Sequence, residues 1–395
     1  MFEKELEELN QKSLLRTLRR INSAQGPRVK IDGREIILLS SNNYLGLANH
    51  PRVKEAAIRV IEKYGFGSGA SRLISGNMTL HEELEERIAD FKGTEAAILF
   101  NSGYTANIGI IPALVGKGDF IYSDELNHVS IIDGSRLSSA EIRIYPHKDM
   151  TVLEELLKKD KNNGRKLIVT DTVFSMDGDI APLKDIYNLS QRYSAFLMVD
   201  EAHATGVLGS KGRGAVEHFA LKGENIIQMG TLGKALGTFG AYIAGSKDLI
   251  VYLRNKARSF IYTTSLPPAV AAAAIEAINI IAEDNSLIKG LWDNRKVFID
   301  GLHSLGFDTL SSETPIIPVL AGNIHKALEM AETLYEECIY APAIRPPTVP
   351  EGSSRIRTTV MANHTKEDIE AALSAFRKIK NGKGSNNHRC VERTR

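Results

Sequence analysis

Two neighbouring segments carry an acid and a lysine in settings that favour chemistry. The first, FLMVDEAHATG, is an apolar run that ends in Asp200 and is followed by His203, and the second, QMGTLGKALG, holds Lys234 among glycines. An acid at the carboxyl end of a buried parallel strand lies where open α/β sheets bind their ligands. An apolar neighbourhood disfavours the charge of a lysine, and a neutral lysine amine is a nucleophile toward carbonyl groups.

The pair predicts pyridoxal phosphate (PLP) as cofactor. An ionised Asp200 keeps a pyridine nitrogen protonated and so preserves the electron-accepting ring, while His203 can reach the ring hydroxyl. Thr231 and the glycines beside Lys234 offer a hydroxyl and backbone amides to a phosphate. Taken singly, Asp200 is also compatible with a helix cap, His203 with a bond to the backbone, and Lys234 with a surface loop.

Three further segments could complete such a site. Gly103 and Tyr104 follow the strand-like run AILF and open a segment of helical character, which is a typical phosphate-binding position. His128 in DELNHVS could stack on a flat ring or pack as an ordinary loop histidine. Arg355 and Arg357 alternate onto one face of RIRTTV, where a guanidinium can bind a carboxylate through paired hydrogen bonds or simply be solvated.

A nucleotide motor is the rival reading, because VDEAH resembles the acidic segment of such enzymes. A motor also needs a GxxxxGK[ST] phosphate loop, and none is present: Gly118 follows Lys117, and Ala235 follows Lys234. Lys and Arg number 49 against 48 for Asp and Glu, a net charge of +1, so no basic field exists to attract nucleic acid.

Composition predicts a soluble globular protein of about two domains, since 43% of the 395 residues are hydrophobic and 25% charged. The start, MFEKELEELNQK, has no apolar core of a secretory signal, and the apolar stretch 266–282 is interrupted by prolines and polar residues. We therefore expect no membrane partner. Cys338 and Cys390 lie far apart, which predicts no disulfide framework and no metal site and favours the cytoplasm.

Alternating short apolar runs and amphipathic helices predict an α/β fold. The runs AAILF, DFIYS, KLIVT, FLMV, NIIQMG and AYIAG are apolar on both faces, as expected of a mostly parallel central sheet between helical layers. We expect an N-terminal arm (1–45), a large cofactor-binding domain (46–285), a smaller α+β domain (286–380) and a disordered tail (381–395).

Together the motifs resemble the α-oxoamine synthases, PLP-dependent enzymes with the aspartate-aminotransferase-type fold (fold type I). The resemblance runs in order along the chain through SSNNYLGLANHP, GSGASRLISGN, LFNSGYTAN, DELNHVS, VFSMDGD, VDEAHATGV, TLGKALG, YTTSLPP and RPPTVPEGSSRIR.

The resemblance assigns roles residue by residue. It implies that Lys234 carries the cofactor, Asp200 pairs with the ring nitrogen and His203 contacts the ring hydroxyl. It also implies that His128 stacks over the ring and that the active sites are shared across a homodimer. The remaining implied cofactor contacts are Gly103, Tyr104, Ser175, Thr231 and, from the second subunit, Thr264. The implied substrate contacts are Arg16, Asn42 and Arg357, of which the arginine at 357 binds the amino acid carboxylate.

Smaller features choose among branches of this family. The segments QGPRVKIDGRE and AIRPPTVPEGSSRIR favour the branch that joins L-alanine to a pimeloyl thioester, carried by CoA or a carrier protein, with loss of carbon dioxide. The branch that acetylates glycine is the nearest alternative, and it usually lacks the run Arg345-Pro346-Pro347. One departure is Asp171, a shorter acid where some synthases have glutamate.

Overall fold

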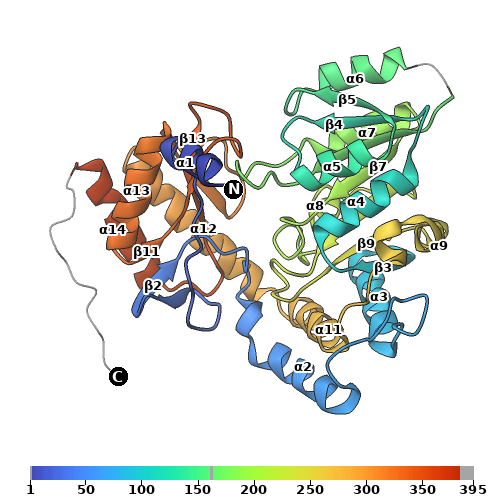
Figure 1. Cartoon of the computed structure of the whole chain (residues 1–395), viewed down its shortest axis with the longest axis horizontal. Coiled ribbons are helices and arrows are strands. Elements are labelled where there is room, and N and C mark those ends of the chain that lie inside the picture. Colours follow the sequence, from blue (N-terminus) through green and yellow to red (C-terminus); the bar gives the residue numbers. More distant parts are fainter. Residues whose placement is uncertain (1, 161–162, 383–395) are drawn as a thin grey trace. The chain divides into compact units, whose positions relative to one another are not determined.

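The chain folds into two compact units in a computed structural model that describes residues 2–160 and 163–382 (Figure 1). The larger unit comprises Leu47–Ser175 and Asp179–Ile288. The described residues of the smaller unit fall within Met1–Gly46, Met176–Gly178 and Lys289–Arg395. The N-terminal segment therefore belongs to the same unit as the chain's C-terminal part.

A seven-stranded sheet forms the centre of the larger unit, in the order β3-β9-β8-β7-β6-β4-β5. Strands β4 to β8 pair in parallel, whereas β9 runs antiparallel to β3 and β8. This confirms the predicted mostly parallel sheet. The strands are β3 (Ala96–Phe100), β4 (Phe120–Asp124), β5 (Glu141–Tyr145), β6 (Lys166–Asp171), β7 (Phe196–Asp200), β8 (Ile226–Thr231) and β9 (Ala241–Gly245).

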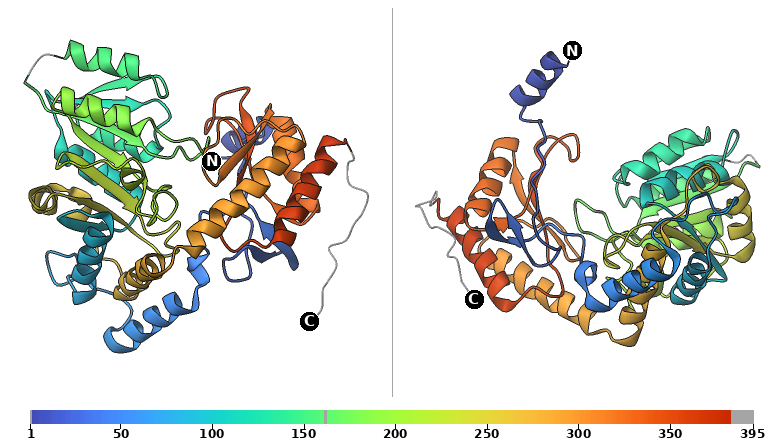
Figure 2. Two further views of the ribbon diagram at one scale, coloured as in Figure 1. Left: turned by 180° about the vertical axis from the view of Figure 1, so that it is seen from behind. Right: turned by 60° about the horizontal axis from the view of Figure 1, so that its bottom comes forward.

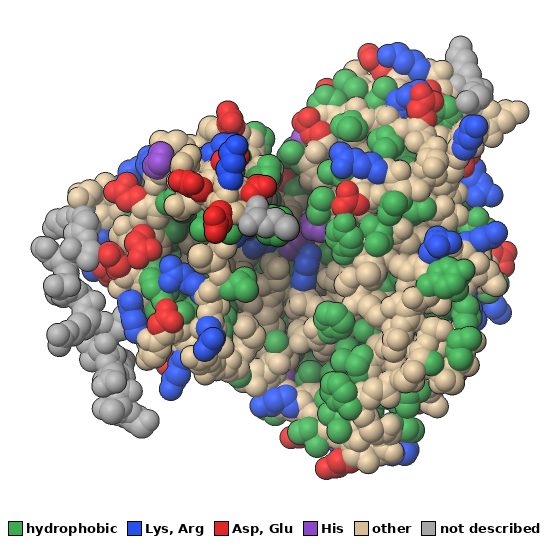
Figure 3. Space-filling model, in the orientation of Figure 1, with side chains coloured by type: hydrophobic (Ala, Val, Ile, Leu, Met, Phe, Trp, Pro, Cys, Tyr) green, Lys and Arg blue, Asp and Glu red, His purple; other side chains and the backbone are tan. Residues whose placement is uncertain are grey.

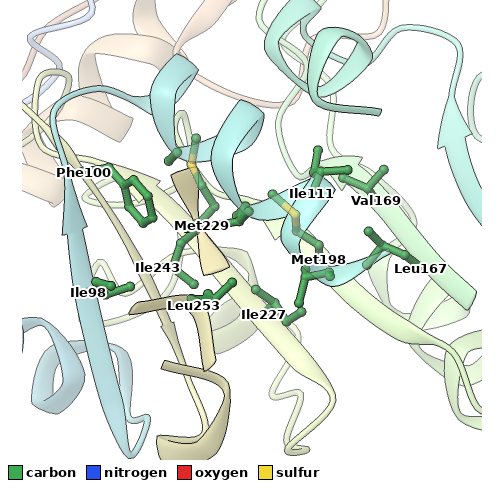
Figure 4. Packing of buried hydrophobic residues seen from close by; sticks show 14 of the residues in the cluster. Ile98, Phe100, Ile111, Leu167, Val169, Met198, Ile227, Met229, Ile243 and Leu253 are labelled. Atoms are coloured by element: carbon green, nitrogen blue, oxygen red, sulfur yellow. The ribbon is translucent and has the colours of Figure 1, made fainter. Parts of the chain in front are cut away.

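Helices cover both faces of this sheet (Figure 2). One face is closed by α4, α5, α9 and α10, whose apolar side chains pack with alternate strand residues such as Ile98, Met198 and Ile227 in a continuous cluster (Figure 4). The described helices of the larger unit are η1 (Leu47–Asn49), α2 (Pro51–Tyr64), α3 (Thr79–Lys92), α4 (Gly103–Leu114), α5 (Val129–Leu137), α6 (Met150–Lys159), α7 (Leu183–Arg192), α8 (Ala215–His218), α9 (Lys247–Lys256), α10 (Arg258–Ile261) and α11 (Pro268–Glu283).

Strand β5 is the one strand of this sheet that the apolar-run pattern did not predict. It pairs only with β4, at the edge of the sheet, and its sequence EIRIY keeps Glu141 and Ile144 exposed. An edge strand needs burial on fewer sides, so the continuous apolar pattern of the central strands is absent there.

The smaller unit contains two three-stranded sheets, β1-β2-β11 and β10-β13-β12. Asp32 and Gly33 join β1 to β2 with positive φ angles of 50° and 77°, as a two-residue hairpin turn requires. Its strands are β1 (Arg28–Ile31), β2 (Arg34–Leu38), β10 (Ile316–Gly322), β11 (Ile339–Tyr340), β12 (Ala343–Ile344) and β13 (Ser354–Thr359). Its helices are α1 (Glu3–Gln11), α12 (Ser286–Ser304, from residue 289 onward), α13 (Ile324–Glu336) and α14 (Lys366–Lys380).

Several expectations concern charge, membranes and cysteines. On the face shown in Figure 3, acidic and basic side chains are interspersed. Within residues 2–160 and 163–382, no helix is long and apolar enough to cross a membrane. Of the two cysteines for which the sequence predicted no disulfide framework, Cys338 follows α13, and its Sγ lies 3.2 Å from a guanidinium nitrogen of Arg34. Cys390 and residues 383–395 of the predicted tail lie outside the described residues.

A buried ion pair connects α3 to the segment that carries Asp200 and His203. Lys92, at the end of α3, contacts a carboxylate oxygen of Glu201 and the backbone carbonyl of Arg213, and both charged side chains have no exposed surface. Glu201 also accepts the backbone N–H of Val216 at 2.9 Å. The pair therefore ties both ends of the loop 201–216 to α3.

Replacing Lys92 should be strongly destabilising, because it leaves the Glu201 charge buried without its cation. We expect Lys92→Met to lower the free energy of unfolding by about 3–5 kcal/mol, measured by urea denaturation followed by circular dichroism. The double variant Lys92→Met/Glu201→Gln should recover part of the loss, since the amide keeps an acceptor for Val216 without a charge. Lys63→Met, at an exposed position of α2, is the control. Equal stability of Lys92→Met and this control would contradict the interpretation.

Candidate functional site

The site is built on the carboxyl ends of three neighbouring strands. Asp171 ends β6, Asp200 ends β7 and Thr231 ends β8. Asp171 and Asp200 are directly paired in the β-sheet register. Carboxyl ends of parallel strands meet at one edge of the sheet, so the fold brings these side chains together although they are far apart in sequence.

Asp200 is buried and held from two sides. Its Oδ1 accepts the backbone N–H of Ala202 at 2.9 Å, and its Oδ2 accepts an N–H of the Asn107 side chain at 2.9 Å. The carboxylate is therefore fixed in orientation by a loop amide and by helix α4. Sequence reasoning missed Asn107; its position within the helix that begins at the predicted phosphate-binding segment was the available signal.

Lys234 and His203 are brought together. Lys234 lies in the loop between β8 and β9, and its Nζ is 2.8 Å from Nε2 of His203. His203 is buried and follows Asp200 by three residues, whereas Lys234 is half-buried. The acid, the histidine and the lysine predicted from the two opening segments thus share one sheet edge.

A narrow cradle lies between α4 and the end of β8. Ser102 caps α4 by accepting the backbone N–H of Thr105, and Gly103 is the first helical residue. A Cβ built on Gly103 would lie 2.8 Å from Cγ2 of Thr231, so only glycine allows this close approach. Within the described chain, the buried hydroxyl of Thr231 has no hydrogen-bond partner. A helix N-terminus beside an unpaired hydroxyl fits the phosphate of PLP.

His128 caps helix α5 beside the two strand-end acids. Its backbone N–H donates to Asp171 Oδ2 at 2.6 Å, and its Nδ1 is 2.7 Å from the Ser130 hydroxyl. Burial of the imidazole is the largest influence on the His128 pKa and lowers it; Asp200 acts in the opposite direction. Burial, followed by the neighbouring Asp200, raises the pKa of Asp171 well above its ordinary value. The shorter acid at 171 thus reaches the main chain of His128.

The remaining expected cofactor contacts of the larger unit occupy less enclosed positions. Tyr104 is exposed, and its hydroxyl donates to Asp133. Ser175 is half-buried in the loop after β6. Thr264 is exposed, and its backbone carbonyl accepts an N–H of Asn101 at 2.9 Å.

The expected substrate contacts lie in the smaller unit. Arg357, buried on β13, donates to Oδ1 of Asn42 at 3.2 Å. Its neighbour on the same face, Arg355, instead pairs with Asp177 at 2.6 Å. Burial raises the pKa of Tyr44 to about 12, against the opposing effect of Arg357 beside it. Arg16 is exposed, and its guanidinium is 3.5 Å from the Thr348 hydroxyl.

Comparison with known proteins places the chain in a family. The sequence profile described as aminotransferase class I and II matches residues 34–376. The chain therefore belongs to the class I and II aminotransferase family.

Its relatives narrow this class further. The chain is 56% identical to the 8-amino-7-oxononanoate synthase of Thermoanaerobacter pseudethanolicus, an alignment that covers 96% of each protein. It is 54% identical to the 8-amino-7-oxononanoate synthase of Geobacter sulfurreducens over 95% of this chain and 96% of that one.

Solved structures agree with the fold. Serine palmitoyltransferase from S. paucimobilis with bound PLP aligns with a TM-score of 0.92 at 32% identity, covering 96% of this chain and 98% of that one. The 8-amino-7-oxononanoate synthase of Francisella tularensis aligns with a TM-score of 0.76 at 32% identity, over 87% of this chain and 97% of that one. The predicted fold class and the resemblance to the α-oxoamine synthases are confirmed.

A charged cluster anchors the segment that leads to His128. His147 contacts Asp124 at 3.0 Å and Asp179 at 2.9 Å through its two ring nitrogens. Asp124, the last residue of β4, also accepts the backbone N–H of Leu126 at 2.9 Å. Burial opposes the charge of His147, but hydrogen bonds to both acids raise its pKa from 6.5 to about 9.

This shift makes a signed prediction for stability against pH. Because the folded pKa of His147 lies above the unfolded value, its stabilising effect is fully present below pH 6.5 and is lost as pH rises through about 9. The unfolding free energy of wild type minus that of His147→Gln should therefore be largest near pH 6, at most about 3 kcal/mol, and shrink toward zero by pH 10. Urea titrations of both proteins from pH 5.5 to 10 measure this difference. A difference independent of pH would contradict the charged state of His147.

Proposed function

We propose that this protein catalyses the PLP-dependent condensation of L-alanine with a pimeloyl thioester. The products are 8-amino-7-oxononanoate, carbon dioxide and the free thiol carrier, and the reaction belongs to biotin biosynthesis. The observation that carries the proposal is identity of 49–56%, over at least 94% of the chain, to relatives that all bear the name 8-amino-7-oxononanoate synthase.

The sheet edge of the larger unit would hold the cofactor. PLP, when bound, supplies an electron-accepting ring that stabilises negative charge on the α-carbon of an amino acid. Asp200 would bind the ring nitrogen and His203 the ring hydroxyl, and the phosphate would lie against the amides of Gly103 and Tyr104 and the hydroxyl of Thr231. Ser175 would complete these contacts, and Thr264 would reach the phosphate from a second copy of the chain.

Lys234 and His128 would do the acid–base work. The Nζ of Lys234, as a free amine, would take the α-proton of alanine, and His203 Nε2 at 2.8 Å is placed to orient that amine. His128, whose lowered pKa favours the neutral imidazole, would cover the face of the ring. Its ring N–H would donate to the thioester oxygen as negative charge develops there.

Arg357 and Asn42 would bind the carboxylate of alanine. The guanidinium offers two parallel N–H donors, and its bond to Asn42 Oδ1 fixes its plane. Arg355 is engaged by Asp177 and would be structural. Arg16 would contact the acyl substrate. We further propose a cytoplasmic homodimer with shared active sites.

The lysine assignment can be tested by trapping the cofactor. Borohydride reduction of the purified protein with PLP should add the reduced cofactor's mass to the peptide that contains Lys234, because the amine of Lys234 would hold the cofactor through its carbonyl carbon. The same treatment of Lys234→Ala should leave that peptide unmodified. Mass spectrometry after proteolysis is the readout, and label on another lysine in the wild-type protein would refute the assignment.

The substrates can be tested by supplying two donor and acceptor pairs in parallel. We expect kcat/KM with L-alanine and pimeloyl-CoA to exceed that with glycine and acetyl-CoA by at least about a hundredfold, measured as free thiol released. Pimeloyl carrier protein, offered at the same concentration, decides between the two carriers. Faster turnover of glycine with acetyl-CoA would reject the proposed substrates and leave the family assignment intact.

A further inference from the structure

A chain of hydrogen bonds connects Asp200 to His128 through two side chains that have no role in the function proposed above. The side-chain nitrogen of Asn107 donates to Asp200 Oδ2 and to Ser130 Oγ, each at 2.9 Å. Ser130 Oγ lies 2.7 Å from Nδ1 of His128. Asn107 and Ser130 are 0% and 1% exposed, so water does not compete for these bonds.

The Asp200 carboxylate determines which group donates and which accepts in each hydrogen bond of this series. A carboxylate only accepts, so Asn107 must turn its NH₂ group toward Asp200; the reversed amide would set two acceptors against each other. The second N–H of Asn107 then occupies Ser130 Oγ, and the serine hydroxyl hydrogen points to His128. In this orientation Asn107 Oδ1 is buried without a partner among the described residues, a cost that only firm bonds on the nitrogen side offset.

The chain ends by making Nδ1 of His128 an acceptor. The Ser130 hydroxyl donates to this atom, and the Ser130 backbone N–H, 3.2 Å away, points to it as well. A neutral imidazole with an accepting Nδ1 carries its hydrogen on Nε2. This Nε2–H group can then donate a hydrogen bond to a reacting group.

We propose that Asn107 and Ser130 are positioning residues that set the tautomer of His128 and couple it to Asp200. This inference rests on the proposed function, because it assigns His128 Nε2 as the donor to the reacting acyl oxygen. The hydrogen-bond chain links the carboxylate assigned to the cofactor ring with the histidine assigned to the substrate. The same two residues therefore adjust both ends of the site.

Close packing of two helices makes the chain possible. Ser130 and Gly134 lie one turn apart on α5, and Asn107 and Ile111 lie one turn apart on α4, so each pair shares a helix face. A Cβ on Gly134 would lie 2.7 Å from the backbone oxygen of Asn107 and 3.0 Å from Ile111. The glycine lets α5 approach α4 closely enough for Ser130 to reach the Asn107 side chain.

The tautomer is measured directly in full-length, PLP-loaded protein labelled with ¹⁵N-histidine. The chain has ten histidines, and the signal of His128 is the one missing in His128→Gln. We expect Nδ1 of wild-type His128 to show the shift of an unprotonated ring nitrogen and Nε2 that of a protonated one. The opposite pattern in wild type would overturn the proposal without any further variant.

Two variants separate the two couplings. Ser130→Ala removes a donor to neutral Nδ1, so the pKa of His128 should rise by about half a pH unit while the Kd for PLP stays within about twofold. The charged groups that act on His128 are Asp200, which raises its pKa, and Lys234, which lowers it, and both remain in this variant. Asn107→Leu should raise the pKa of His128 and also weaken PLP binding about tenfold, since Asp200 loses a donor.

Matched controls distinguish positioning from general loosening. Ser135→Ala removes an equally buried hydroxyl of α5 that donates only to its own helix, at the carbonyl of Ile131, and should leave both readouts at wild-type values. Ser130→Thr keeps the hydroxyl and should restore the wild-type titration of His128. Unchanged His128 titration in both Ser130→Ala and Asn107→Leu would refute the coupling, whereas the substrate comparison in wild type tests the proposed function separately.

Discussion

Two buried carboxylates lie side by side where β6 and β7 end, and the rest of the site depends on this juxtaposition. Asp171 and Asp200 are register partners, and burial together with Asp200 raises the pKa of Asp171. Each acid accepts hydrogen bonds from a different part of the fold. Asp171 takes the main-chain N–H of His128, and Asp200 takes a loop amide and the side chain of Asn107. The acids thereby fix the start of α5, the loop after β7 and one face of α4 relative to each other.

Charges elsewhere in the larger unit support this edge of the sheet without taking part in its chemistry. Lys92 and Glu201, both fully buried, hold the loop that follows Asp200, and His147 holds the segment between β4 and His128. In the smaller unit, two neighbouring arginines on β13 have different kinds of partner. Arg355 is neutralised by Asp177, while Arg357 is buried and donates to the amide oxygen of Asn42, an uncharged partner.

The fold was largely predictable because burial on both faces leaves a plain apolar pattern. Six strands of the central sheet were visible as apolar runs, but the edge strand β5 was not, since exposure on its outer side admits Glu141 and Arg143. Asp200 at the end of an apolar run and Lys234 between glycines were also recognisable, because each pattern consists of residues adjacent in the sequence. Asn107 was not, because its importance arises only when α4 packs over the end of β7, a contact between residues 93 positions apart. The predicted site residues of the smaller unit rest on the family resemblance. The alternating pattern alone does not distinguish Arg355 from Arg357 as the substrate contact.

Gly134 determines the spacing of α4 and α5 on which the hydrogen bonds of the site depend. The missing side chain sets how closely α5 lies on α4, and the hydrogen bond from Asn107 to Ser130 is kept only within a few tenths of an ångström of that spacing. A slight widening of the helix pair, caused by a distant change in the core, would disturb the acid and the histidine together. Variation in the apolar layer beneath α4 and α5 is therefore a route by which evolution or engineering can alter reactivity without replacing any residue that touches substrate.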